Sequence, residues 1–129
     1  MILLDTHTLV WATAESKRLS KAAADAIFKA QKEGGLAVAA ISLWELAMLV
    51  VRGRIQAYGT VDASVRLLTE GVIIKPITPE IASLAAQFPD DFPRDPADRL
   101  IAATARSEGI ALITRDDKLR ASPLLQTIW

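Results

Sequence analysis

The chain has 129 residues, of which 51% are hydrophobic and 23% are charged. This length and balance fit one compact domain with a sizeable apolar core, and they exclude intrinsic disorder. The 15 basic and 15 acidic residues cancel to a formal net charge of zero, so any contact with nucleic acid has to be local. The chain has no Cys and a single His, which excludes disulfides and the usual zinc sites but leaves room for a hard cation with oxygen ligands.

The N-terminus begins Met-Ile-Leu-Leu-Asp and lacks the basic start and cleavage site of a signal peptide. The most apolar stretch, residues 36–51, is interrupted by Ser42 and Glu45. It is also shorter than the ~20 residues that cross a bilayer. We therefore expect a soluble, cytoplasmic protein that has no membrane segment.

In the first half of the chain, short apolar runs alternate with helical patterns, which is typical of a parallel sheet covered by helices on both faces. Ser20 has the residue type of an N-cap, and Gly34 that of a helix stop. Ser42 and Glu45 have the S-x-x-E spacing of a capping box. These signals predict, in order, a strand at residues 2–4, a helix at 20–33, a strand at 36–40 and a helix at 42–52.

In the second half, Thr78 and Asp95 each precede a proline, which is the pattern of an N-cap followed by proline in the first turn. The pattern predicts, in order, a helix at 62–70, a strand at 72–76, helices at 78–88 and 95–107, a strand at 110–114 and a fifth strand in the tail at 124–129. We expect a single α/β domain over residues 1–129, a three-layer α/β/α sandwich with a central, mostly parallel sheet of four to five strands.

Four acidic residues occupy positions where open parallel sheets bind ligands, just beyond the carboxyl ends of strands. Asp5 directly follows the first predicted strand and Asp116 follows the fourth. Glu45 and Asp98 lie in the first turns of two predicted helices. We expect these side chains, which are distant in sequence, to converge at one edge of the sheet.

Glu45 is the most informative of the four acids. Residues 43–51 around it are apolar on all sides of the predicted helix, and such helices are usually buried. A buried carboxylate needs a partner or a metal ion, because removing its charge from water is costly. Two carboxylates ~4 Å apart also repel by about 4 kcal/mol at an effective dielectric near 20. Either protonation or a divalent cation such as Mg²⁺ relieves this repulsion, and the cation can also activate a water molecule for attack on a phosphodiester.

Four motifs occur in order along the whole chain: Asp5-Thr6-His7-Thr8-Leu9-Val10-Trp11, Ser42-Leu43-Trp44-Glu45-Leu46, Asp95-Pro96-Ala97-Asp98-Arg99-Leu100-Ile101-Ala102-Ala103-Thr104-Ala105 and Leu112-Ile113-Thr114-Arg115-Asp116. This combination resembles the PIN-domain toxins of the VapC family. The resemblance implies a PIN-like fold and an endoribonuclease, dependent on Mg²⁺ or Mn²⁺, that cuts transfer RNA or ribosomal RNA as the toxin of a toxin–antitoxin pair. It also implies a homodimer and a cognate VapB-type antitoxin.

The resemblance also implies which residues form the site. Four residues match the acidic, metal-binding and catalytic positions of the PIN site: Asp5, Glu45, Asp98 and Asp116. Asp95 is either a fifth, outer carboxylate or only an N-cap. Asp117 is an alternative to Asp116 for the fourth acidic position, because the sequence does not fix the register there. Thr6 and Thr114 match hydroxyl positions that support the acids.

Each acid also has a purely structural interpretation, as a turn residue, a capping-box member or a helix start. His7 is interpreted as a packed or hydrogen-bonded residue rather than a base. The tryptophans Trp11, Trp44 and Trp129 are interpreted as core or interface anchors rather than as surfaces on which bases stack. The arginines near the strand ends, which are either surface residues or phosphate ligands, are Arg52, Arg54, Arg94, Arg99 and Arg115.

Two other classes of protein compete with the nuclease. A phosphatase of the haloacid dehalogenase class needs a second Asp two residues after the first, and His7 occupies that position. A non-catalytic RNA-binding or interaction module on the same fold is the stronger alternative, because a fold can persist with a silent site.

Overall fold

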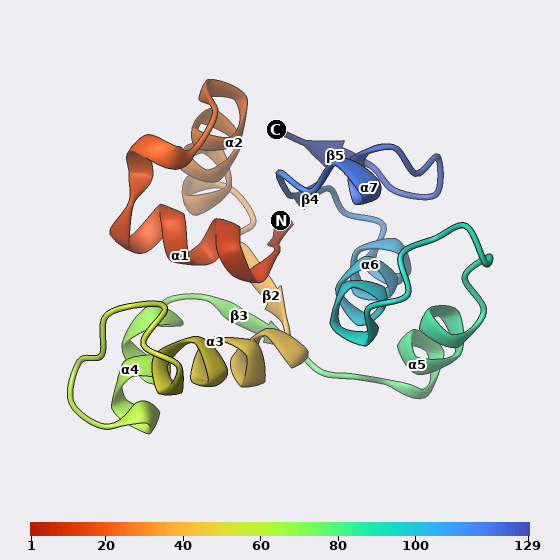
Figure 1. The fold of residues 1–129 in the computed structure, drawn as a ribbon. Coiled ribbons are helices and arrows are strands. Elements are labelled where there is room, and N and C mark those ends of the chain that lie inside the picture. Colours follow the sequence, from red (N-terminus) through yellow and green to blue (C-terminus); the bar gives the residue numbers. More distant parts are fainter.

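A five-stranded, fully parallel sheet forms the centre of the computed structural model, which describes residues 1–129 (Figure 1). The strands are β1 (Ile2–Leu4), β2 (Leu36–Ala39), β3 (Ile73–Lys75), β4 (Leu112–Ile113) and β5 (Thr127–Ile128). Their order across the sheet is β3-β2-β1-β4-β5, and every neighbouring pair is parallel. The predicted α/β class is confirmed, with all five strands present.

The helices are α1 (Thr6–Ala14), the short 3-10 helix η1 (Ser16–Arg18), α2 (Lys21–Lys32), α3 (Ile41–Val51), α4 (Val61–Leu68), α5 (Pro79–Ala86), α6 (Pro96–Glu108) and α7 (Asp117–Arg120). Three predicted N-caps are confirmed, because the side chains of Ser20, Thr78 and Asp95 accept hydrogen bonds from backbone N–H groups of α2, α5 and α6. Gly109 ends α6 in the left-handed conformation, with φ of 64°. None of these helices is long and apolar enough to span a bilayer.

Two α-helices, α1 and α7, are missing from the predicted order of elements, although a helix start was one structural interpretation of Asp116. The segment after Asp5 is rich in β-branched and aromatic residues, a composition that favours strands. It nevertheless forms α1, because the Asp5 carboxylate accepts a hydrogen bond from the Thr8 N–H and caps the helix directly after β1. In a similar way, Asp116 caps the four-residue helix α7, which begins after a three-residue turn that follows β4. At both strand ends the cap determines the local structure, whereas the propensity of the following residues does not.

The capping box predicted for α3 is wrong. The helix begins at Ile41 after Ala40, which makes no side-chain capping bond, and Ser42 is a fully buried residue inside the helix. The expectation that α3 is buried on all sides is also wrong, since Trp44 is 60% exposed and Val51 is 66% exposed. One side of α3 therefore faces solvent although its sequence is almost entirely apolar.

Successive residues of β1 point into two separate cores, as the two-residue period of a strand requires. Leu3 packs in the core with residues of α5, α6 and α7, whereas Leu4 packs in the core with residues of α1, α2, α3 and α4. Both leucines are fully buried, and burial of each such side chain stabilises the fold by roughly 1.5–3 kcal/mol. The two cores make the three layers of the predicted α/β/α sandwich, with helices on both faces of the sheet (Figure 1).

The strand order places a crevice beside β1. The chain runs outward from β1 to β2 and β3, then returns to form β4 and β5 on the opposite side of β1. In open parallel sheets, the place where the order reverses leaves a crevice beyond the carboxyl ends of the strands. Asp5 and Asp116 follow β1 and β4, so both lie at this position.

Candidate functional site

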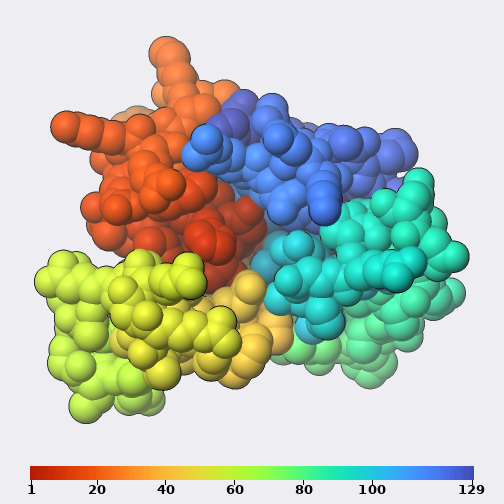
Figure 2. Space-filling view, viewed as in Figure 1, coloured from red at the N-terminus to blue at the C-terminus, as the bar shows by residue number.

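A pocket of about 780 Å³ lies at the carboxyl edge of the sheet. It collects all four predicted acids, both uncertain ones and the supporting Thr6; these are Asp5, Thr6, Glu45, Asp95, Asp98, Asp116 and Asp117. Figure 2 shows the face of the molecule on which the N-terminal segment, α3 and the segments that form α6 and α7 come together. Hereafter this cavity is called the acidic pocket.

Asp5 and Asp116 reach the acidic pocket as helix caps. The Asp5 Oδ1 accepts a hydrogen bond from the Thr8 N–H at 2.8 Å. The Asp116 Oδ1 accepts from the N–H groups of Lys118 and Leu119 at 2.8 and 3.2 Å. In both residues one carboxylate oxygen anchors the side chain and the other accepts no hydrogen bond from the protein, which leaves it available to a ligand.

The predicted support from Thr114 takes the form of a backbone contact. Its side chain is fully buried, and its Oγ1 accepts a hydrogen bond from the Asp116 N–H at 3.1 Å. This bond fixes the turn that carries Asp116 from β4 into α7. Asp117 also lines the acidic pocket, but its side chain is 96% exposed and lies 3.6 Å from Arg120.

Asp95 and Asp98 both lie at the start of α6. The Asp95 Oδ1 accepts hydrogen bonds from the N–H groups of Ala97 and Asp98, so Asp95 is an N-cap and a pocket residue at the same time. The pKa of Asp98 is raised to about 7, first by burial and then by the negative charges of Asp95, Asp116, Glu45 and Asp5, in that order of importance. Four carboxylates from separate segments therefore act on one carboxyl group.

Glu45 is held by a pair of buried hydroxyl groups. The Thr6 Oγ1 donates a hydrogen bond to the Glu45 Oε1 at 2.5 Å and lies 2.9 Å from the Ser42 Oγ. Since a hydroxyl has one proton, Ser42 supplies the proton of the second contact when Thr6 donates to Glu45. Burial raises the pKa of Glu45 and the Thr6 bond lowers it, with smaller effects from Asp95, His7 and Asp5.

The donors of the acidic pocket fit a hard divalent cation in their chemistry, because they are carboxylate oxygens. Two of the carboxyls have a raised pKa, which is the signature of burial and repulsion that a bound cation relieves. No group of three or more Asp, Glu or His side chains is arranged in this structure to hold one ion. An ion held here without rearrangement would therefore take one or two of the carboxylates as ligands and keep several waters, as Mg²⁺ commonly does.

His7 differs from its prediction as a packed or hydrogen-bonded residue. Its side chain is exposed, lines the acidic pocket and makes no hydrogen bond, and its ring lies 6.1 Å from that of Trp11. Trp11 is a core residue, as expected, and packs against Trp129. Trp44 is mostly exposed, so the core interpretation is wrong for this tryptophan.

Of the five arginines named from the sequence, one is structural and two line the acidic pocket. Arg99 is structural, because its guanidinium donates hydrogen bonds to backbone carbonyls of Ala85, Phe88, Pro89 and Pro93. The two arginines that line the acidic pocket are Arg94 and Arg115.

Two contributors to the site were missed from the sequence. Lys118 lines the acidic pocket. It was missed because it lies in helix α7, which was not among the predicted elements. Ser42, which we interpreted as a helix cap, contacts Thr6 instead. The signal that identifies Ser42 is its position three residues before Glu45 inside a helix, which places both side chains on one face.

Residues 2–123 match the sequence model of the PIN domain. The chain belongs to the PIN domain family. This PIN domain is 46% identical to the ribonuclease VapC22 of Mycobacterium tuberculosis, over 99% of the chain and 98% of the relative.

Solved structures with the same fold include several VapBC structures. The DNA-bound VapBC of Salmonella typhimurium matches with a TM-score of 0.72 and 18% identity, over 98% of this chain and 97% of that one. VapBC-1 of nontypeable Haemophilus influenzae matches with a TM-score of 0.71 and 22% identity, over 98% and 96%. VapBC2 of Rickettsia felis, bound to a promoter DNA fragment, gives 0.70 and 17%, over 98% and 97%. At these identities, the structural likeness establishes the fold alone.

Proposed function

We propose that this PIN domain is a metal-dependent endoribonuclease that acts as the toxin of a toxin–antitoxin pair. The observation that carries the proposal is the convergence of Asp5, Glu45, Asp98 and Asp116 on one pocket, where their charges and burial raise the pKa of Asp98 to about 7. Strongly perturbed carboxyls in a cleft are typical of functional sites. The ribonuclease VapC22, 46% identical over nearly the whole chain, supports RNA as the substrate.

The same four carboxylates would hold Mg²⁺ or Mn²⁺, which when bound supplies an activated water and neutralises charge on the phosphodiester. Thr6 keeps the Glu45 carboxylate in place through its 2.5 Å hydrogen bond. The caps made by Asp5 and Asp116 fix one oxygen of each and leave the other for the ligand. Asp98 has to lose its proton before it can serve as a ligand.

Basic residues at the rim of the acidic pocket suit the RNA backbone. Arg94, Arg115 and Lys118 line the pocket beside the acids, and none of them forms an ion pair with a carboxylate of the chain. Such free cations commonly contact phosphate oxygens and fix the register of the nucleic acid. We assign these three residues to substrate positioning, and Asp5, Glu45, Asp98 and Asp116 to catalysis.

The partners that we propose are a transfer RNA or ribosomal RNA substrate, a second copy of this chain and a VapB-type antitoxin. Structures of VapBC complexes share the fold over 98% of this chain, which supports a toxin–antitoxin pair. Co-expression with the antitoxin encoded by a neighbouring gene tests this pairing, since growth arrest by the PIN domain alone should then be relieved. Growth arrest that persists beside every adjacent candidate would contradict it.

The nuclease is tested by incubating purified protein with transfer RNA and ribosomal RNA in Mg²⁺ or Mn²⁺ and in EDTA. We expect discrete cleavage products with metal and none in EDTA. Asp5→Asn should abolish cleavage while the circular dichroism spectrum stays unchanged. Asp25→Asn is the matched control, because Asp25 is exposed and pairs with Lys21 on α2. Cleavage that persists in EDTA would overturn the metal-dependent mechanism.

A non-catalytic RNA-binding or interaction module is the second candidate. The observation that favours it is the lack of any group of three side chains arranged to hold a metal ion. Titration calorimetry with Mn²⁺ separates the two functions. A nuclease should bind Mn²⁺ with an affinity that falls in Asp98→Asn, whereas a silent domain should give no heat of binding in either protein.

A further inference from the structure

A second, smaller pocket adjoins the acidic pocket along α3. It has a volume of about 190 Å³ and shares Thr6, His7 and Glu45 with the acidic pocket, so the two cavities meet at these residues. Its volume lies below the ~300–1,000 Å³ of pockets that enclose a whole small-molecule ligand. It therefore suits one part of a longer chain that also enters the acidic pocket. Hereafter this cavity is called the α3 pocket.

The spacing of residues along α3 explains the wall of the α3 pocket. Trp44, Met48 and Arg52 are four residues apart and so lie on one face of the helix. All three line the pocket, and Trp44 is 60% exposed. An indole that is largely in solvent beside a cavity offers a free flat surface, which is what a base needs for stacking.

The end of α3 turns Arg54 back toward the same pocket. The Gly53 N–H donates to the Val50 carbonyl at 3.1 Å and the Arg54 N–H donates to the Leu49 carbonyl at 2.9 Å. This is the bond pattern of a Schellman motif, which needs a left-handed residue after the helix, and Gly53 has φ of 67°. Because the chain reverses there, Arg52 and Arg54 both line the α3 pocket.

The charges of the α3 pocket are free to bind an anion. Arg52 and Arg54 are exposed and neither forms an ion pair with a carboxylate of the chain, whereas Arg18, Arg66 and Arg120 each lie within 3.6 Å of one. Two unpaired guanidinium groups next to an exposed indole complement the two parts of a nucleotide, the phosphate and the base. Glu45, at the junction with the acidic pocket, is the one carboxylate in the lining of the α3 pocket, whereas several carboxylates line the acidic pocket.

We propose that the α3 pocket binds the nucleotide next to the scissile phosphate of a single-stranded RNA segment, with the base on Trp44 and the flanking phosphates on Arg52 and Arg54. This inference rests on the proposed nuclease function. A single strand or loop is required, since only an unstacked base can lie against an aromatic side chain. Through this contact, the α3 pocket selects where along an RNA the cut is placed.

The test is the binding of a fluorescein-labelled oligouridylate, measured by fluorescence anisotropy in EDTA over a series of salt concentrations. Trp44→Ala should weaken binding by about tenfold, whereas Trp44→Phe should keep most of the affinity. Arg52→Ala combined with Arg54→Ala should lower the slope of log affinity against log salt by about 1.4, which is roughly 0.7 for each phosphate contact that is lost.

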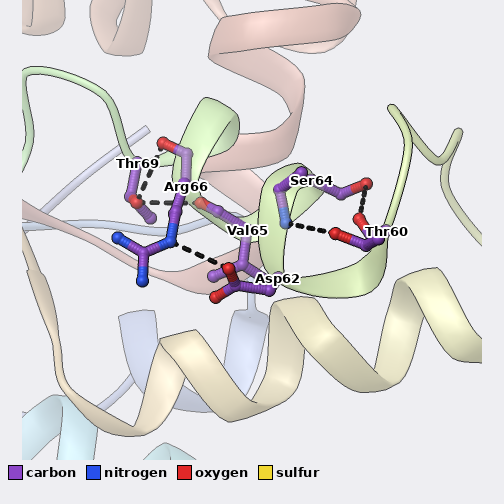
Figure 3. Close-up of polar contacts among 7 residues, drawn as sticks. Thr60, Asp62, Ser64, Val65, Arg66 and Thr69 are labelled. Carbon is purple, nitrogen blue, oxygen red and sulfur yellow. Dashed lines mark hydrogen bonds and ion pairs between the residues drawn. The ribbon is translucent and has the colours of Figure 1, made fainter.

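Two control variants match these changes. Phe28→Ala removes an aromatic ring on α2 that is 61% exposed but lines neither pocket. Arg66→Ala removes an exposed arginine that already pairs with Asp62 at 3.0 Å on α4 (Figure 3). Both should leave the affinity and the salt slope unchanged.

The results separate this inference from the nuclease itself. The wild-type protein could cut RNA with metal while the pocket variants bind oligouridylate with unchanged affinity and salt slope. That result would refute RNA binding in the α3 pocket and leave the nuclease proposal intact. If the variants lose affinity but the wild-type protein does not cut RNA, RNA binding in the α3 pocket is supported and the nuclease proposal is refuted. If Trp44→Ala instead dissociates a dimer in light scattering without changing RNA affinity, the pocket is a protein interface and the inference fails.

Discussion

Asp98→Asn should stabilise the metal-free protein at alkaline pH. Burial and the neighbouring carboxylates raise the pKa of Asp98 from its ordinary value of 3.8 to about 7. The folded chain thus binds the proton more tightly than the unfolded chain. Stability should fall as pH rises from about 4 to 7, and the full penalty should persist above that range. Asn carries no charge at any pH, so the variant escapes the penalty.

The pKa difference corresponds to at most ~4 kcal/mol. Because the carboxyl is only half-buried and water screens its charge, we expect about 1–2 kcal/mol at pH 8. This gain would raise the melting temperature by roughly 3–8 °C for a chain of this size. Thermal unfolding in EDTA near pH 4 and pH 8 measures it, with Asp62→Asn, an exposed residue paired with Arg66 (Figure 3), as the control. An equal gain at both pH values would refute the electrostatic argument.

Three further predictions concern the same region. Thr6→Val should raise the pKa of Glu45 further and destabilise the fold by about 1.5–3 kcal/mol, because the carboxylate loses its donor; unfolding in urea measures the loss, and Thr6→Ser should restore stability. The cleavage rate should rise with pH through about 7, as Asp98 loses its proton. A pH–rate profile whose midpoint does not change with the Mg²⁺ concentration would contradict this prediction. Gly53→Ala should cost roughly 1–2 kcal/mol in urea unfolding, since only the left-handed backbone, and no neighbouring atom, opposes the added methyl group.

The sheet was predictable from the sequence because its strands are short, apolar and bounded by clear signals. Gly34 as a helix stop, and Thr78 and Asp95 as caps before a proline, are local signals. Each depends only on the backbone of the adjacent helix end, so the sequence alone revealed it. The prediction failed at α1 and α7, where no more than three residues separate a strand from the following helix. An Asp caps the helix at each place, and the propensity of the residues that follow it does not reveal that role.

The acidic pocket was predictable in composition but not in detail. Positions after parallel strands converge for topological reasons, so Asp5 and Asp116 were expected to meet. The reasoning for Glu45 was only partly right, because α3 has an exposed side and the carboxylate is half-buried rather than enclosed. Its true partner, Thr6, lies 39 residues away, and no local pattern in the sequence joins the two.

The separation of charges explains how a chain with no net charge can serve an RNA substrate. The acids gather in the acidic pocket, where they repel a phosphate backbone until a cation neutralises them. The unpaired arginines Arg52, Arg54, Arg94 and Arg115 line the acidic pocket or the adjoining α3 pocket, where they attract the same backbone. In the proposed nuclease, attraction beside the acids would hold RNA along the site, while repulsion within the acidic pocket would make entry of the phosphate depend on the metal. In the proposed nuclease, the cation is thus required for binding the scissile phosphate as well as for cutting it.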